Sequence, residues 1–282
     1  MNKYKIEELF AKIFMVTSLV IVLGSLILIT GTVIWRGLPA LNLAMITQAP
    51  KGGYYIGKEG GILNAILGSL FLAGGATIIS SLISLPIAIY LQMYTINSRV
   101  AEIIRLSLDV LWGIPSIVYG AFGFSIMLFL GIRASLLGGI ITLALLEVPI
   151  MTRGMDEAIN MVPLALKESS FALGATRYET AIKVIIRQTA PGILTAILLA
   201  FGRAIGDAAS VLFTAGYTDR LPTSLLGPAA SLPLAVFFQL GTPFPAVQER
   251  AYAAALILTI IVLVVSLLSR SISRRLKKHI VH

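Results

Sequence analysis

The chain of 282 residues has no cysteine and only two histidines, His279 and His282, both within the last four positions. The absence of thiols excludes a disulfide framework and any thiolate metal site, and a basic tail accounts for both histidines without a metal. Charge is also scarce, because 12% of the residues are Asp, Glu, Lys or Arg, whereas 57% are hydrophobic. A soluble protein of this composition would lack the polar surface to cover its core, so lipid must surround much of the chain.

Sequence motifs for catalysis are missing as well. The chain contains no Gly-x-x-x-x-Gly-Lys-Ser/Thr run, no His-Glu-x-x-His and no plausible serine nucleophile elbow. It therefore cannot hold a nucleotide by the usual phosphate loop, and it has no residues on which an enzyme mechanism could rest. We expect a protein that is not an enzyme and that binds no cofactor or metal itself.

Long apolar runs are abundant, and they predict an all-α integral membrane protein with six transmembrane helices. Each run is long enough to cross a hydrocarbon core of ~30 Å, although one of them is broken at Gly113-Ile114-Pro115-Ser116. Residues 221–248 are also apolar, but five prolines forbid one regular helix, so we expect an irregular or short-helical extracytoplasmic segment. The six predicted spans are residues 13–35, 64–94, 107–130, 134–152, 192–217 and 251–269.

The distribution of cations sets the predicted orientation. With the N-terminus inside, cytoplasmic segments collect fifteen of the twenty-two Lys and Arg residues, and external segments hold six. A seventh span would place the basic tail outside, so the positive-inside rule favours six spans with both termini in the cytoplasm. The net charge of +9 is then explained by membrane topology, and nucleic-acid binding is excluded.

One charged stretch, residues 162–191, interrupts the apolar runs between the fourth and fifth spans. Pro163 suits the first turn of a helix, and Gly174 is expected to stop that helix. A second short helix is expected from Thr176, whose side chain can cap the backbone amide of Glu179. We therefore predict a helix-Gly-helix unit on the cytoplasmic side that docks onto another protein.

Ionisable residues inside spans should face a helix bundle or a watery path, because a charge in lipid costs several kcal/mol. Arg203 and Asp207 are separated by four residues, so we expect them to share a helix face and to be able to pair. Two readings stay open, an ion pair that fixes helix packing and a polar path in which the Arg meets an oxyanion. Asp109 and Glu147 are placed nearer span ends, where a structural or snorkelling role is favoured.

The charged stretch resembles a known family motif. Glu168-Ser169-Ser170, followed by Phe171-Ala172-Leu173 and Gly174, is similar to the cytoplasmic "EAA" loop of ABC importer permeases. Serines replace both alanines of the motif, and Arg187 stands where the family usually has proline.

Three further stretches narrow the resemblance to phosphate-specific, or Pst-type, permeases over about residues 60 to 270. Residues 113–120 resemble a segment of their third span, and residues 203–207 resemble their Arg-x-x-Gly-Glu, with Asp207 in place of Glu. Residues 210–215 and 221–225 are similar to the PstA-type member rather than to its PstC-type partner.

This resemblance implies a type I ABC importer permease fold with a cytoplasmic coupling helix, and a transmembrane subunit of an ATP-driven phosphate importer in the cell membrane. The implied partners are a second, PstC-type permease, a PstB-type ATPase dimer that binds ATP and Mg, and an extracytoplasmic PstS-type phosphate-binding protein. A permease for another oxyanion (molybdate, sulfate or phosphonate) and a secondary carrier remain the alternatives. We divide the chain into residues 1–60 (first span and connection), 61–275 (permease domain) and 276–282 (basic tail).

The resemblance also implies two groups of functional residues. The residues that couple to the ATPase are Glu168, Ser169, Ser170, Gly174 and Ala175. The residues of the translocation path are Arg203, Asp207, Asp109, Pro115 and Ser116.

Overall fold

The structure is a computed structural model that describes residues 3–51, 59–95 and 98–277. His279 and His282 lie outside the described residues. Apart from a two-stranded antiparallel hairpin of β1 (Pro50–Lys51) and β2 (Glu59–Gly60), the regular structure of the described ranges is helical. In chain order the helices are α1 (Lys3–Gly37), α2 (Leu43–Thr47), α3 (Leu63–Met93), α4 (Arg99–Gly113), α5 (Ser116–Phe129), α6 (Leu136–Asn160), α7 (Leu164–Ala172), α8 (Arg177–Glu179), η1 (Thr180–Ile185), α9 (Ile186–Gly206), α10 (Leu232–Leu240) and α11 (Pro245–Lys277).

Five helical segments in the described ranges are long and apolar enough to cross a membrane. They are α1, α3, α6, the continuous run from α8 through η1 to α9, and α11. The helices α4 and α5 pass the same test together, with a bend of 96° between them. Counted as one broken span, this pair brings the number to six, which confirms the predicted fold class.

The centre of the bundle is formed by α3 and α6, which run parallel to each other. Ser80 and Ser84 of α3 donate hydroxyl hydrogen bonds to the Ala144 and Val148 carbonyls of α6 at 3.1 and 3.2 Å. The helix α9 runs back along α6, and small residues allow close approach there. A Cβ on Gly192, for example, would lie 2.6 Å from the Cβ of Ala158.

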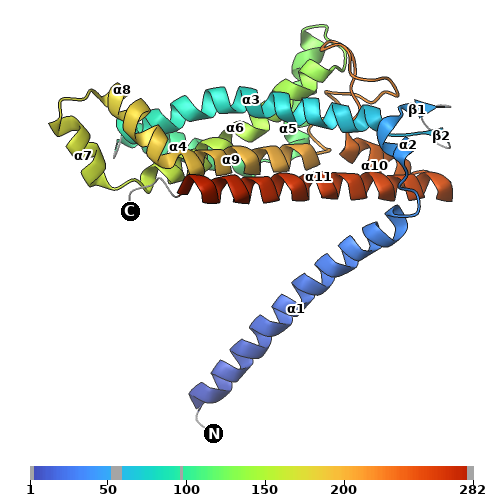
Figure 1. Cartoon of the computed structure of the whole chain (residues 1–282), viewed down its shortest axis with the longest axis horizontal. Coiled ribbons are helices and arrows are strands. Elements are labelled where there is room, and N and C mark those ends of the chain that lie inside the picture. The colour runs from blue at the N-terminus through green and yellow to red at the C-terminus, as the bar shows by residue number, and fades with distance from the viewer. Residues whose placement is uncertain (1–2, 52–58, 96–97, 278–282) are drawn as a thin grey trace.

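The two ends of the bundle differ in content. Figure 1 shows α7, α8 and the C-terminal end of α11 at one end, whereas the hairpin, α2 and α10 lie at the other. The helix α1 projects away from the bundle and packs against α11, and the apolar stretch that qualifies it as a span has no buried residue. The face of α1 that the sequence makes apolar is therefore uncovered in the isolated chain.

Three element boundaries differ from the six predicted spans. Between the first two spans, Asn42 accepts a hydrogen bond from Met45 N at 2.7 Å and caps the short helix α2. The third span was predicted to begin at residue 107, but α4 already begins at Arg99, where Ser98 caps it. Charged residues share α4 with apolar ones, so the segment is an amphipathic helix.

The third boundary concerns the fifth span, which was predicted for residues 192–217. The helix α9 ends at Gly206, and the residues that follow form turns. The proline-rich segment is short-helical as expected, because its regular helices are α10, capped by Ser231, and the first turn of α11.

Candidate functional site

The predicted helix-Gly-helix unit is confirmed at its first helix. Pro163 precedes α7, and Gly174 lies two residues after its end with φ of +84°. A Cβ on Gly174 would meet no atom within 4 Å, so it is the left-handed backbone that requires glycine here, without any crowding. The Gly174 and Ala175 amides donate to the carbonyls of Phe171 and Ser170 at 2.9 and 3.2 Å, which closes the helix end.

The predicted cap of the second helix is also confirmed, but the helix itself is not short. Thr176 Oγ1 accepts from Glu179 N at 3.2 Å, while Glu179 Oε2 accepts from Thr176 N at 3.1 Å. From Arg177 the helix continues through the π-helical segment η1 into α9, and Pro191 lies inside it. The second helix is therefore the beginning of the fifth span, and Pro191 is tolerated because neighbouring helices pack around this buried residue.

A buried hydrogen bond braces α7 against η1. The hydroxyls of Ser170 and Thr180 lie 2.8 Å apart, and both side chains are buried. Lys167 is buried beside them, and this burial lowers the pKa of its amine. In contrast, Glu168 and Ser169 are exposed on the outer side of α7. The predicted coupling residues thus divide into Ser170, Gly174 and half-buried Ala175, which shape the loop, and two residues that face outward.

The predicted pairing of Arg203 with Asp207 is wrong. Asp207 has left the helix, with φ of −80° and ψ of 127°, and its carboxylate accepts hydrogen bonds from the amide and hydroxyl of Ser210. Within the described ranges no acidic side chain pairs with Arg203, which is exposed on the last turn of α9. An ion pair between these two residues therefore does not hold the helices together in this structure.

The break in the third span lies close to the turn that follows α9. Across the break, the Tyr119 hydroxyl donates to the Leu111 carbonyl at 2.9 Å. A Cβ on Gly120 would lie 2.8 Å from the Ala209 carbonyl oxygen, so the N-terminal half of α5 packs against the turn that follows α9. The structure thereby brings Pro115 and Ser116 to the same region as Arg203 and Asp207.

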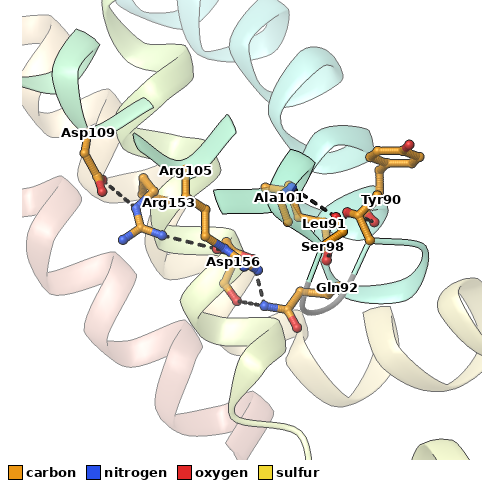
Figure 2. A network of polar contacts seen from close by, with 10 residues as sticks. Tyr90, Leu91, Gln92, Ser98, Ala101, Arg105, Asp109, Arg153 and Asp156 are labelled. Carbon is orange, nitrogen blue, oxygen red and sulfur yellow. Dashed lines mark hydrogen bonds and ion pairs between the residues drawn. The ribbon is translucent and has the colours of Figure 1, made fainter. Parts of the chain in front are cut away.

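Asp109 does not belong to this region's contacts. Its carboxylate pairs with Arg153 of α6 at 2.7 Å, in a network that also contains Arg105, Asp156 and Gln92 (Figure 2). Sequence reasoning missed this network. The signal that could have shown it is the pair of opposite charges one turn apart on each of two helices.

Glu147 lies in the middle of α6 rather than near a span end, because α6 extends to Asn160. The side chain is buried between α6 and α3, where Oε1 accepts from Thr77 Oγ1 at 3.2 Å. Its place in the α3–α6 contact agrees with the structural role favoured for it, and no path residue is among its hydrogen-bond partners.

The fold is that of known transporter permeases. Residues 84–280 match the family model of the "Binding-protein-dependent transport system inner membrane component". One solved relative is a bacterial alginate ABC transporter in complex with its alginate pentasaccharide-bound periplasmic protein, with a TM-score of 0.68, 14% identity, and 98% of this chain and 97% of that chain covered. Another is the inward-facing MetNI methionine ABC transporter, with a TM-score of 0.61, 19% identity, and 76% and 95% covered. These likenesses define the class as a type I ABC importer permease of the inner membrane.

Comparison with curated proteins narrows the class. The "Phosphate transport system permease protein PstA" of Haemophilus influenzae is 34% identical over 253 residues, which is 90% of this chain and 89% of the relative. PstA 1 of Mycobacterium tuberculosis strain H37Rv is 33% identical over 266 residues, or 93% and 86%. The chain belongs to the PstA family of phosphate transport system permeases, within the inner-membrane components of binding-protein-dependent transport systems.

Proposed function

We propose that this chain is a transmembrane subunit of an ATP-driven importer of inorganic phosphate, and that Arg203 meets the anion. The observation that carries the proposal is an exposed guanidinium, free of acidic partners in the described residues, beside a broken span in a member of the PstA family. An Arg offers two parallel donors that match the oxygens of phosphate. The surface of the bundle on which Arg203 is exposed then forms part of the translocation path.

The chain is expected to work with partners that supply the other parts of the importer. Glu168 and Ser169 face outward from α7, so we assign them to contact with a cytoplasmic ATPase dimer that binds ATP and Mg. The end of the bundle with α7 and the C-terminal end of α11 lies in the cytoplasm in this proposal, in agreement with the positive-inside rule (Figure 1). The opposite end, with the hairpin and α10, then receives the phosphate-binding protein. The uncovered face of α1 meets lipid and a second permease.

The chemistry of Arg203 sets the requirement on the path. A fixed cation in a bundle of low dielectric would bind phosphate strongly, so we expect water in the path to reach Arg203 and to keep the site weak enough to release the anion. Asp207 holds the turn after α9 through Ser210, which places the last turn of α9 next to the break in the third span. Movement of the break then changes the surroundings of Arg203.

Uptake of labelled phosphate tests the proposal in proteoliposomes that contain the complete complex. Arg203→Gln is expected to abolish uptake, whereas ATP hydrolysis persists because the complex still assembles. Arg203→Lys is expected to restore uptake only poorly, since an ammonium lacks the two-pronged geometry. Arg133→Gln removes an exposed Arg from the turn between α5 and α6 and serves as the control.

Near-normal uptake by Arg203→Gln at matched amounts of complex would refute the role of Arg203. Uptake of other labelled oxyanions tests the anion separately. Little uptake of labelled phosphate by the unaltered complex, together with uptake of labelled molybdate, sulfate or a phosphonate, would assign another oxyanion to the same path.

A further inference from the structure

Two helices near the start of α7 are joined by paired charges. The Asp156 carboxylate of α6 accepts from Arg105 Nε of α4 at 2.8 Å and from Arg105 Nη2 at 3.2 Å. Arg153 Nε of α6 pairs with the Asp109 carboxylate of α4 at 2.7 Å (Figure 2). Arg105 and Asp109 are one turn apart on α4, and Arg153 and Asp156 are nearly one turn apart on α6. The helix α4 is therefore held to α6 at two successive turns.

Asp156 is the centre of this network. Its side chain is 3% exposed, against 28% for Arg105 and 22% for Arg153. Besides Arg105, it accepts from Arg153 Nη1 at 3.3 Å and from Gln92 Nε2 of α3 at 2.8 Å. The buried carboxylate is thus compensated by donors from three helices, which is the condition under which a buried charge is tolerated. Loss of one donor leaves the remaining charges poorly compensated.

Apolar packing contributes little to the position of α4. Only Ala101 and Leu108 of this helix are buried, and both belong to a small cluster with Leu91 of α3. The axes of α4 and α5 also differ by 96° at the break, so α4 does not continue the line of α5. Because few residues of α4 are buried, the ion pairs to α6 make a large contribution to its position.

The network lies between α7 and the break in the third span. Asp156 lies one turn before the end of α6 at Asn160, and α7 follows after Pro163. Asp109 lies one turn before the end of α4 at Gly113, and α5, which follows the break, packs against the turn after α9. A displacement of α7 that moves the end of α6 therefore reaches the break through these side chains.

We propose that Asp156, Arg105, Arg153 and Asp109 are positioning residues that make α4 move with α6, so that motion of α7 is carried to the break beside Arg203. This inference rests on the proposed function, because it requires α7 to be moved by an ATPase. The four residues touch no substrate in this mechanism. They act on the path only through the position of α4.

A charge exchange between the two helices tests the proposal. Asp109→Arg places two cations opposite each other, and Arg153→Asp places an anion opposite Asp109 and near Asp156. The double variant restores attraction, because α4 then carries only Arg at these positions and α6 only Asp. Each single variant is expected to lower the phosphate imported per ATP hydrolysed by about tenfold, and the double variant to recover to within about twofold. Arg133→Asp makes a comparable charge change away from the network and is expected to leave the ratio unchanged.

A distance measurement separates coupling from simple loss of structure. The chain has no cysteine, so spin labels can be placed at Ile103→Cys of α4 and Asn160→Cys of α6, which are both exposed, in a complex whose other subunits also lack cysteine. The proposal expects one distance with and without ATP in the otherwise native chain, and an ATP-dependent change in Asp109→Arg. If that variant does not assemble, Asp109→Asn, which only removes the half-exposed charge, is expected to give the same change in milder form.

Equal losses in the single and double variants, or a label distance that changes with ATP in the native chain, would overturn the proposal. The distance is read with ATP alone, so it does not depend on the anion. A complex that transports another oxyanion would refute the proposed substrate and leave this test intact.

Discussion

Replacement of Gly174 by valine isolates the contribution of one backbone conformation to coupling. Gly174 has φ of +84°, and a side chain there would meet nothing within 4 Å, so the penalty of Gly174→Val is purely conformational. An L-residue in the left-handed region costs about 1–2 kcal/mol, and a β-branched one lies at the upper end of that range. This reduces the population of the native loop by about five- to thirtyfold relative to alternatives.

The loss is expected to spread along the loop. The amides of Gly174 and Ala175 close α7, and Ser170, which accepts one of these bonds on its carbonyl, braces α7 through its hydroxyl. Once this turn opens, α7 can rotate away from η1, and the outward face with Glu168 loses its fixed direction. The permease should still insert, because the spans on either side are unaffected.

The assay compares Gly174→Val with Gly174→Asn at equal membrane levels. Asn tolerates the left-handed region far better than a β-branched residue does, so Gly174→Asn is expected to keep most co-purification of the ATPase and most uptake. Gly174→Val is expected to lose both. Wild-type co-purification and uptake in Gly174→Val would show that the left-handed turn does not set the direction of α7.

Two other predictions concern the brace and the topology. Thr180→Val leaves the buried Ser170 hydroxyl without its partner and should lower the free energy of unfolding by about 1–3 kcal/mol, seen as a reduced thermal unfolding temperature of the purified complex. Thr180→Ser keeps the hydroxyl and is the control; equal temperatures for both variants would contradict the role of the bond. Exposed Thr223, changed to cysteine, should react with a membrane-impermeant maleimide from the external side only, whereas buried Ser231→Cys should be protected. Labelling of Thr223→Cys only from the cytoplasmic side would reverse the proposed orientation.

Features set by local chemistry could be predicted from the sequence. The spans follow from uncharged runs whose length must match the bilayer, and the end of α7 follows from glycine's access to positive φ. The cap at Thr176 follows from side-chain oxygen at a helix start, and the structure has both of its hydrogen bonds.

Features that depend on competition between partners could not be predicted. Spacing alone places Asp207 on the same helix face as Arg203. However, the amide and hydroxyl of Ser210 both donate to the Asp207 carboxylate in a turn, so the helix ends before Asp207. Asp109 likewise has a charged residue four positions away on its own helix, yet it pairs with Arg153 of α6. Sequence spacing identifies neighbours along one helix, and the choice among partners from different helices is made by tertiary packing.

The π-helical segment η1 has a consequence for the evolution of these chains. A π-helix closes its hydrogen bonds one residue later than an α-helix, so η1 holds an additional residue within an otherwise regular run from Arg177 to Gly206. In an α-helix, one residue more or less turns everything downstream by about 100°. A deletion inside η1 can instead be absorbed by conversion of the wide turn to an ordinary one, which leaves Arg203 on the same side of α9. Between α7 and Arg203, the length of the chain can therefore change at η1 without altering which side of the fifth span faces the path.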